Sequence, residues 1–173
     1  MSTSLYDISV ASYLQTIVAV TGYLNKGLEF CMSKKIDTEE LTESRLFADM
    51  LPLRFQIVSV AHHSMGAVEG LKKGLFEPPG QVAALDYRGL QKLIVDTTEA
   101  LRRLSPAEVN ALQGRDVTFK FRDRQIPFTT ENFVLSFSLP NFYFHATTAY
   151  DILRTKGVPL GKRDFLGQLR VKA

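Results

Sequence analysis

The sequence contains few of the residues that mark special compartments. Cys31 is the single cysteine among 173 residues, which excludes an internal disulfide and is typical of a reducing compartment. No run approaches the roughly 18 apolar residues of a membrane span. The N-terminal segment lacks a basic region, and Asp7 interrupts its first apolar stretch, so we expect no signal peptide. We therefore expect a cytoplasmic protein that does not enter a membrane.

An excess of charge of one sign is also missing. The net charge is +3, from 21 basic and 18 acidic residues. This excess is too small to indicate binding to nucleic acid, which requires a concentrated basic face. Hydrophobic residues make up 45% and charged residues 23%, a balance typical of globular proteins. Internal repeats and low-complexity segments are absent, so we interpret residues 1–173 as a single domain.

Histidine is scarce as well. The three histidines are His62, His63 and His145. A mononuclear catalytic metal site usually takes three protein ligands. Adjacent residues of a helix point about 100° apart, so His62 and His63 cannot easily bind the same metal ion. A complete site would then need another ligand, such as Asp49 or Tyr150, and nothing in the sequence selects either residue.

Helical periodicity is what the sequence has in abundance. Apolar residues recur at spacings of three and four in four long stretches, approximately residues 5–34, 52–73, 86–104 and 130–157. Before the last stretch, Val117, Phe119 and Phe121 alternate with polar residues, and Ile126 and Phe128 follow a polar turn. The patterns predict an all-α fold, an up-and-down four-helix bundle with a short β-hairpin inserted before the last long helix.

Local signals refine these predictions. Residues 37–40 and 105–108 resemble capping boxes, which predict two short connecting helices. Gly22 and Gly27 indicate a bend in the first long helix. Pro140 lies inside the last one, which should therefore kink there or begin afresh after it.

The second long helix carries two apolar stripes. The first predicts the core side and comprises Leu53, Ile57, Val60, Ser64, Ala67 and Leu71. The second consists of Phe55, Val58, His62 and Met65 and lies on the other side. A helix that is apolar on two sides is either deeply enclosed or faces a partner. This pattern predicts a homodimer formed through the second helix.

The candidate site lies on the last helix, where polar residues interrupt an apolar face. Asn141, His145 and Thr148 should point toward the core or a pocket in it. A buried polar group without a partner costs about 1–3 kcal/mol, so these residues should bond each other, water or a ligand. Tyr13 can bring a hydroxyl from the first helix. The pattern fits either a structural core histidine or a small-molecule pocket with His145, Asn141, Tyr13 and Thr148 as catalytic candidates.

His145 should be shielded from water and should contact the first or second helix. Burial without a carboxylate partner disfavours the charged imidazolium, so we expect its pKa to lie below the reference of about 6.5. Histidine ordinarily titrates near neutral pH and is suited to proton transfer there.

Three segments resemble a known family: MSTSLYDISVASYLQ, KKID…RLFADMLPLRFQI and LPNFYFHATTAYDILRTKGVPLGKRDFLG. They are similar to an uncharacterised domain family that is grouped with the DinB/YfiT-like four-helix bundles, which are often described as metalloenzymes. The resemblance covers nearly the whole chain and implies the bundle fold.

In that superfamily, three histidines bind a divalent metal, one from the second helix and an H-x-x-x-H pair from the fourth. The resemblance implies that His62 or His63 and His145 are the corresponding metal ligands here. The chain departs from the pattern, because Ala149 stands four residues after His145. The protein could bind a divalent metal, zinc or nickel, or no cofactor. The missing histidine favours the absence of a cofactor.

Three functions remain open, and the sequence does not decide whether the protein is an enzyme. The first is binding of a small molecule near His145, with or without metal-free acid–base catalysis. The second, implied by the superfamily's thiol transferases, is a divalent-metal-dependent transferase or hydrolase with an incomplete histidine site. The third is a non-enzymatic homodimeric interaction protein.

Overall fold

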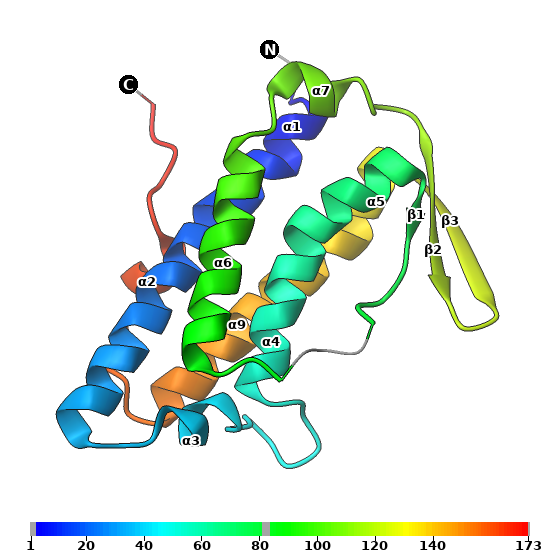
Figure 1. Cartoon of the computed structure of the whole chain (residues 1–173). Coiled ribbons are helices and arrows are strands. Elements are labelled where there is room, and N and C mark those ends of the chain that lie inside the picture. Colours follow the sequence, from blue (N-terminus) through cyan, green and yellow to red (C-terminus); the bar gives the residue numbers. More distant parts are fainter. Residues whose placement is uncertain (1–2, 81–83, 173) are drawn as a thin grey trace.

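The computed structural model describes residues 3–80 and 84–172. In this part of the chain, long helical stretches pack along one another and a small sheet lies at their side (Figure 1). The long stretches are α2 (Val10–Lys34), α4 (Leu53–Ala61) continued by η1 (His62–Gly66) and α5 (Ala67–Lys73), α6 (Tyr87–Arg102), and α8 (Thr130–Phe133) continued by η2 (Val134–Ser138) and α9 (Leu139–Thr155). The shorter helices are α1 (Leu5–Ile8), α3 (Thr38–Thr42), α7 (Pro106–Asn110) and α10 (Lys162–Leu166).

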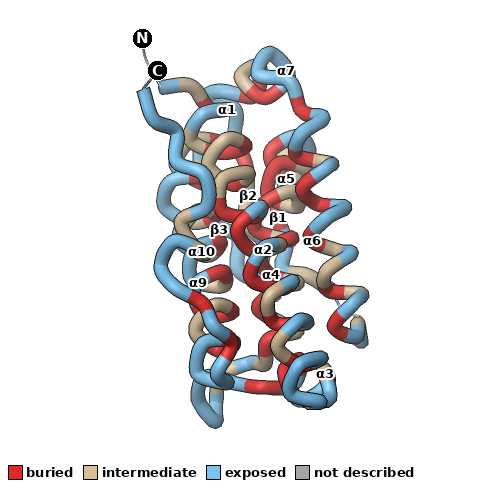
Figure 2. The backbone as a smooth tube through the Cα atoms, turned by 90° about the vertical axis from the view of Figure 1, so that its left-hand side faces the viewer, coloured by how far each residue is buried: buried red, intermediate tan, exposed pale blue. Residues whose placement is uncertain are grey.

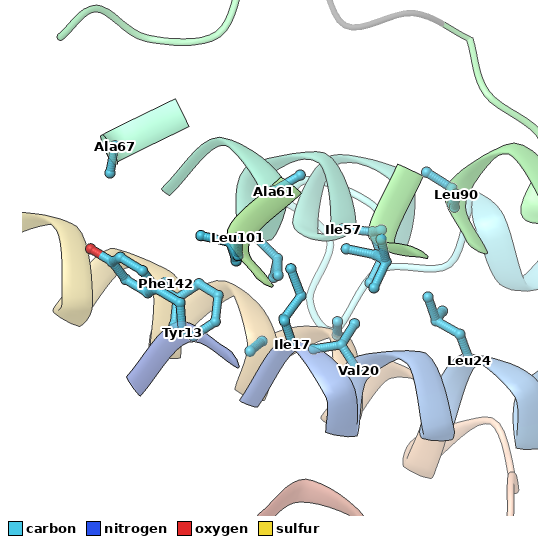
Figure 3. Packing of buried hydrophobic residues seen from close by; sticks show 14 of the residues in the cluster. Tyr13, Ile17, Val20, Leu24, Ile57, Ala61, Ala67, Leu90, Leu101 and Phe142 are labelled. Carbon is cyan, nitrogen blue, oxygen red and sulfur yellow. The ribbon is translucent and has the colours of Figure 1, made fainter. Parts of the chain in front are cut away.

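The core lies between the long helices. α2 and α4 each pack against both α6 and α9, so the four surround a common interior. Figure 2 shows buried residues along the inner sides of the helices. In Figure 3, side chains of α2 face those of the other helices. The labelled residues of α2 are Tyr13, Ile17, Val20 and Leu24. The labelled residues on the other helices include Ile57 and Ala61 of α4, Leu90 and Leu101 of α6, and Phe142 of α9. The apolar stripes read from the sequence therefore form one core.

Two hydrogen bonds show that α2 and α9 run in the same direction. The Tyr13 hydroxyl lies 2.6 Å from Oγ of Ser138, and the Tyr23 hydroxyl donates to the carbonyl of Ala146 at 3.0 Å. The partners follow one another in the same order on both helices. α4 runs the opposite way, and it continues through η1 and α5 toward the end where α9 begins (Figure 1).

α6 is antiparallel to α2. The Tyr87 hydroxyl, at the start of α6, donates to the carbonyl of Leu24 in the second half of α2. α7, which follows α6, lies against α1, and the amide of Tyr6 donates to Oδ1 of Asn110. Consequently α4 and α6 run parallel to each other (Figure 1).

The predicted up-and-down order is therefore wrong, although the four long stretches are present. Two consecutive parallel helices need a connection that returns along their length, and the segment between α5 and α6, described at residues 74–80 and 84–86, lies at this place in the chain. Part of this connection is strand β1 (Leu75–Phe76), which the sequence did not predict. The fold is thus mostly helical with a small three-stranded sheet, and short helices and one crossover connect the long stretches.

The predicted β-hairpin is confirmed. Strands β2 (Asp116–Phe121) and β3 (Arg124–Thr129) pair antiparallel, and Phe119 lies opposite Ile126. Their turn is Arg122–Asp123, and Arg122 adopts a left-handed φ of 54°. β1 adds to the hairpin in parallel, with Phe76 opposite Phe119. A two-residue strand leaves no alternation to detect, and its pairing depends on residues about 40 positions away.

The expected bend at Gly22 or Gly27 does not appear as a break in the helix. The first long helix is interrupted at Ser9, whose hydroxyl donates to the carbonyl of Leu5. Both glycines lie inside α2. At Gly27 a Cβ would fall on the hydroxyl of Tyr87, so this glycine permits close packing of α6 rather than a bend.

The helix does not end and begin again at Pro140. A π-helical segment, η2, precedes it, and the Leu139 amide donates to the carbonyl of Val134, five residues back. Proline has no N–H and its ring crowds the carbonyl four residues earlier. The wider π turn adjusts the hydrogen-bond ladder just before the proline, and the helix continues into α9.

The predicted ends of the last long helix are confirmed. The Thr129 side chain caps its start by accepting from the amide of Asn132. At its end Gly157 has a φ of 94°, and the amide of Val158 donates to the carbonyl of Leu153. This pattern is a Schellman motif, which satisfies carbonyls that the helix would otherwise leave unpaired. Both short helices predicted from capping signals are also present as α3 and α7.

Candidate functional site

A pocket of about 300 Å³ lies where α4, η1 and the last long helix meet the sheet. Its lining is mostly aromatic: Phe55, Ser59, His63, Phe76, Pro78, Pro79, Phe119, Phe121, Phe137, Asn141 and His145. Among these described residues, none is an Asp, Glu, Lys or Arg. The pocket thus combines apolar walls with a few polar groups, as small-molecule sites do.

Two other pockets on the molecule lack a histidine among their described lining residues. One of about 530 Å³ lies between α2 and the C-terminal residues, where Arg102 and Arg170 contribute to its wall. Another, of about 290 Å³, lies between α2 and α6. No histidine is among the described residues that line either hollow. The aromatic pocket is therefore the candidate site.

The hydrogen bonds of His145 determine which of its nitrogens carries the proton. Nδ1 lies 2.7 Å from Oε1 of Gln56, while Nε2 of the same amide donates to the carbonyl of Leu51 at 2.8 Å. The Leu51 carbonyl fixes the orientation of the Gln56 amide, so Oε1 accepts and Nδ1 of His145 must donate. Nε2 of His145 is then an unprotonated acceptor, and it has no hydrogen-bond partner among the described residues.

His145 is neutral at physiological pH. Burial lowers its pKa from 6.5 to about 4, and its hydrogen-bond partner Gln56 brings no charge to offset this effect. The predictions that His145 contacts the second helix and has a lowered pKa are confirmed, whereas the predicted shielding is only partial, because His145 is half-buried.

His63 lies beside His145 and is buried, with 8% of its surface exposed. The two rings are nearly parallel, with an interplanar angle of 18° and centroids 5.6 Å apart. Nδ1 of His63 is buried and has no hydrogen-bond partner within residues 3–80 and 84–172. Its pKa falls to about 3, first because of burial and then because of the neighbouring rings of His62 and His145. The wall of the pocket therefore holds two neutral, stacked imidazoles.

Tyr13 does not line the pocket but is linked to His63 of its wall through Ser138. Its hydroxyl contacts Oγ of Ser138, and Ser138 donates to the carbonyl of His63 at 2.7 Å. Because the single Ser138 proton goes to His63, Tyr13 must be the donor to Ser138. The bonds connect α2 to the two π segments, since His63 lies in η1 and Ser138 closes η2.

The other predicted residues lie in different surroundings. Asn141 lines the pocket, and its Nδ2 donates to the carbonyl of Phe137. Thr148 donates to the carbonyl of Phe144 in its own helix and is not part of the lining. Nε2 of His62 donates to the carbonyl of Glu77 at 2.8 Å. The structure therefore brings His145, Asn141 and His63 to one pocket and leaves Thr148, Tyr13 and His62 outside it.

The available ligands do not fit a three-ligand metal site. Within the described ranges, no three His, Cys, Asp or Glu side chains come together in a way that can hold a metal ion. His62 is turned toward Glu77, and the buried Ala149 stands where the superfamily pattern has its second histidine of the pair. The suggested substitutes do not help: Asp49 is exposed in a loop, and Tyr150 packs against Tyr23 and Phe165.

Several residues that form or support the pocket wall were missed from the sequence. Gln56 is the most important, and it is 2% exposed. A signal was present, because Gln56 is three residues from Leu53 and four from Val60, which places it on the core stripe. The walls contributed by Phe76, Phe119 and the prolines depend on the placement of the sheet, which no local pattern indicates.

Comparison with known proteins agrees with this architecture. The chain is similar to a DinB family member protein from Shewanella denitrificans, solved as a crystal structure at 1.83 Å, with a TM-score of 0.81 and 27% sequence identity. The match covers 98% of this chain and 95% of the other. The fold is thus of the DinB-like class.

A family model described as "Domain of unknown function (DUF1993)" matches residues 5–166, and the chain belongs to this family. The predicted membership of an uncharacterised family within the DinB-like superfamily is therefore confirmed. No curated protein matches the chain. No described helix has the length and apolar character needed to cross a membrane.

Proposed function

We propose that the aromatic pocket binds a small, uncharged and largely apolar molecule that donates a hydrogen bond to Nε2 of His145. One observation carries the proposal. The Gln56 amide holds the proton of His145 on Nδ1, which leaves an acceptor without a partner among the described residues at a largely apolar site. An acceptor on the wall of a largely apolar pocket gains from a donor that a ligand brings. The four long helical stretches, which we infer to form a four-helix bundle with one crossover, provide a rigid wall for such a site.

The preference for an uncharged ligand follows from the lining. Phenylalanine and proline dominate it, and the two imidazoles are neutral near pH 7 because their pKa values lie at about 4 and about 3. A charged ligand would lose its hydration without gaining an opposite charge from the described lining residues. A neutral ligand loses far less and gains from the burial of its apolar surface.

Acid–base catalysis without a metal is the second candidate, because Nε2 of His145 is free to accept a proton. General bases work best when their pKa lies near the working pH. A pKa of about 4 makes His145 a weak base at neutral pH. We therefore favour binding over proton transfer. The metal-dependent alternative is not carried further, because the residues around the pocket do not supply its ligands.

The proposal can be tested by titrating ¹⁵N-labelled protein with toluene, benzoate and benzylammonium at pH 7. We expect toluene to shift the amide signals of Ser59, His63 and Asn141. The two ions should bind at least about tenfold more weakly because of their desolvation cost. Asn141→Phe should fill the pocket and abolish the toluene shifts. Asn132→Phe is the matched control, because Asn132 is exposed in α8 and lies outside the pocket.

Two outcomes would contradict the proposal. One is the absence of localised shifts with toluene in folded wild-type protein. The other is binding of benzoate or benzylammonium as tight as that of toluene. Thermal unfolding of both variants checks that an effect of Asn141→Phe does not come from loss of the fold.

A further inference from the structure

We infer that the ligand carries a hydroxyl group on an aromatic ring, and that His63 and His145 hold this hydroxyl from two sides. The inference rests on the proposed function, because it concerns the ligand of the same pocket. It narrows the ligand from any small, largely apolar hydrogen-bond donor to a phenol. Three features of the pocket support it: the opposite tautomers of the two histidines, the stacking of their rings, and the aromatic walls.

The two histidines offer complementary hydrogen-bonding groups. The bond to Gln56 makes Nε2 of His145 an acceptor. In His63 the buried nitrogen is Nδ1, which has no acceptor among the described residues. Buried N–H groups without an acceptor are rarer than under-satisfied acceptor atoms, so the proton of His63 belongs on Nε2. His63 then donates where His145 accepts.

The spacing of the rings permits one hydroxyl to reach a nitrogen of each. The imidazoles are nearly parallel, and their centroids are 5.6 Å apart. A hydroxyl accepts one hydrogen bond and donates another, and two such bonds at a tetrahedral angle span about 4.5 Å. An ether only accepts and a hydrocarbon does neither, so each leaves at least one imidazole unsatisfied. A carboxylate would only accept and would also bring charge into the pocket.

The walls favour an aromatic ring as the carrier of this hydroxyl. Phe119 and Phe137 have centroids 4.5 Å apart, and Phe55 meets His145 edge to face at 5.8 Å. Aromatic rings interact favourably in such offset and edge-to-face arrangements. The volume of about 300 Å³ lies at the lower end for small-molecule sites and suits a ligand of one or two rings. A phenol is also uncharged at pH 7, since its pKa is about 10.

The test compares three probes of similar shape, p-cresol, 4-methylanisole and toluene, by NMR titration at pH 7. We expect p-cresol to bind on the order of tenfold more tightly than the other two. In His145→Phe this advantage should disappear while toluene still binds. His62→Phe is the matched control and should keep the advantage, because His62 does not line the pocket.

A second variant keeps the test decisive if His145→Phe fails to fold. Gln56→Leu leaves the imidazole in place but removes the acceptor that fixes its tautomer, so the advantage of p-cresol should shrink. Equal binding of all three probes to wild-type protein would overturn the hydroxyl inference and the hydrogen bond to Nε2 of His145, and would leave standing only the binding of an apolar molecule in the pocket. Binding of 4-methylanisole as tight as p-cresol would also overturn it. Absence of binding by all three would overturn the proposed function itself.

Discussion

At the scale of the residue, the chemistry of each histidine is determined by its neighbours. Gln56 holds the proton of His145 on Nδ1, and the carbonyl of Glu77 takes the donor of His62. Nδ1 of His63 has no such partner in the part of the chain that the structure describes. His145 therefore presents an acceptor at Nε2, and the donor of His62 is occupied. For His63 we infer a donor at Nε2 that is available to a ligand.

The low pKa of His145 should make stability depend on pH. The unfolded chain takes up a proton near pH 6.5, whereas folded His145 does so only near pH 4. Below pH 6.5 the unfolded state therefore binds more protons, and the free energy of unfolding falls until about pH 4 and is flat above 6.5. His63 contributes in the same direction, because its pKa is also lowered. His145→Gln should remove one part of this loss, as measured by urea denaturation at pH 7.5 and pH 5. An unchanged difference between the two pH values would contradict the burial of His145.

At the scale of the element, the two π segments lie where the pocket wall is built. η1 carries His63, and η2 ends at Ser138, which donates to the carbonyl of His63. π segments occur often at functional sites, because the wider turn displaces backbone groups from the regular ladder. Here the two π segments are joined directly, because Ser138 of η2 donates to the carbonyl of His63 in η1.

Ser138→Ala tests this connection. The substitution leaves the Tyr13 hydroxyl and the His63 carbonyl without their buried partner, and we expect a loss of about 1–3 kcal/mol in the free energy of unfolding. Ser136→Ala is the control, because Ser136 is exposed in the same segment, and it should change stability by less than about 0.5 kcal/mol. Urea denaturation measures both. Equal effects would show that the bonds of Ser138 contribute nothing special.

The two glycines of α2 provide a second test at this scale. Gly27→Ala places a methyl group on the Tyr87 hydroxyl, so we expect destabilisation by about 1–3 kcal/mol. At Gly22 a Cβ meets no described atom within 4 Å, and alanine should stabilise the helix by about 0.5–1 kcal/mol. Thermal unfolding should therefore shift in opposite directions for the two variants. A shift in the same direction would contradict the packing of α6 on α2.

At the scale of the whole molecule, periodicity predicts which helices form but not how they run. The stripes of the four long helices identified core residues such as Leu53 and Ile57, both fully buried. Periodicity is the same in either direction along a helix, so it could not show that α6 is parallel to α4. The site combines Phe119 and His145, which line the pocket, with Gln56, which bonds His145; these residues are distant in sequence and meet only through tertiary packing.

A homodimer through the second helix remains a prediction. All four residues of its second apolar stripe are half-exposed, and Phe55 and His62 pack against His145 and Phe76 of the same chain. We propose that Val58 and Met65 contact the partner. Val58→Asp and Met65→Asp should then convert a dimer to a monomer in light scattering, with helical circular dichroism preserved. Wild-type protein that is monomeric at micromolar concentration would remove the idea.

The central claim is that His63 and His145 are neutral and hold their protons on opposite ring nitrogens. Long-range ¹H–¹⁵N correlation spectra of histidine-labelled protein at pH 7 measure this directly, since they distinguish the two neutral tautomers from the cation. We predict the Nδ1–H form for His145, because Gln56 accepts from it, and the Nε2–H form for His63. A charged ring for either residue, or the same tautomer for both, would contradict the account.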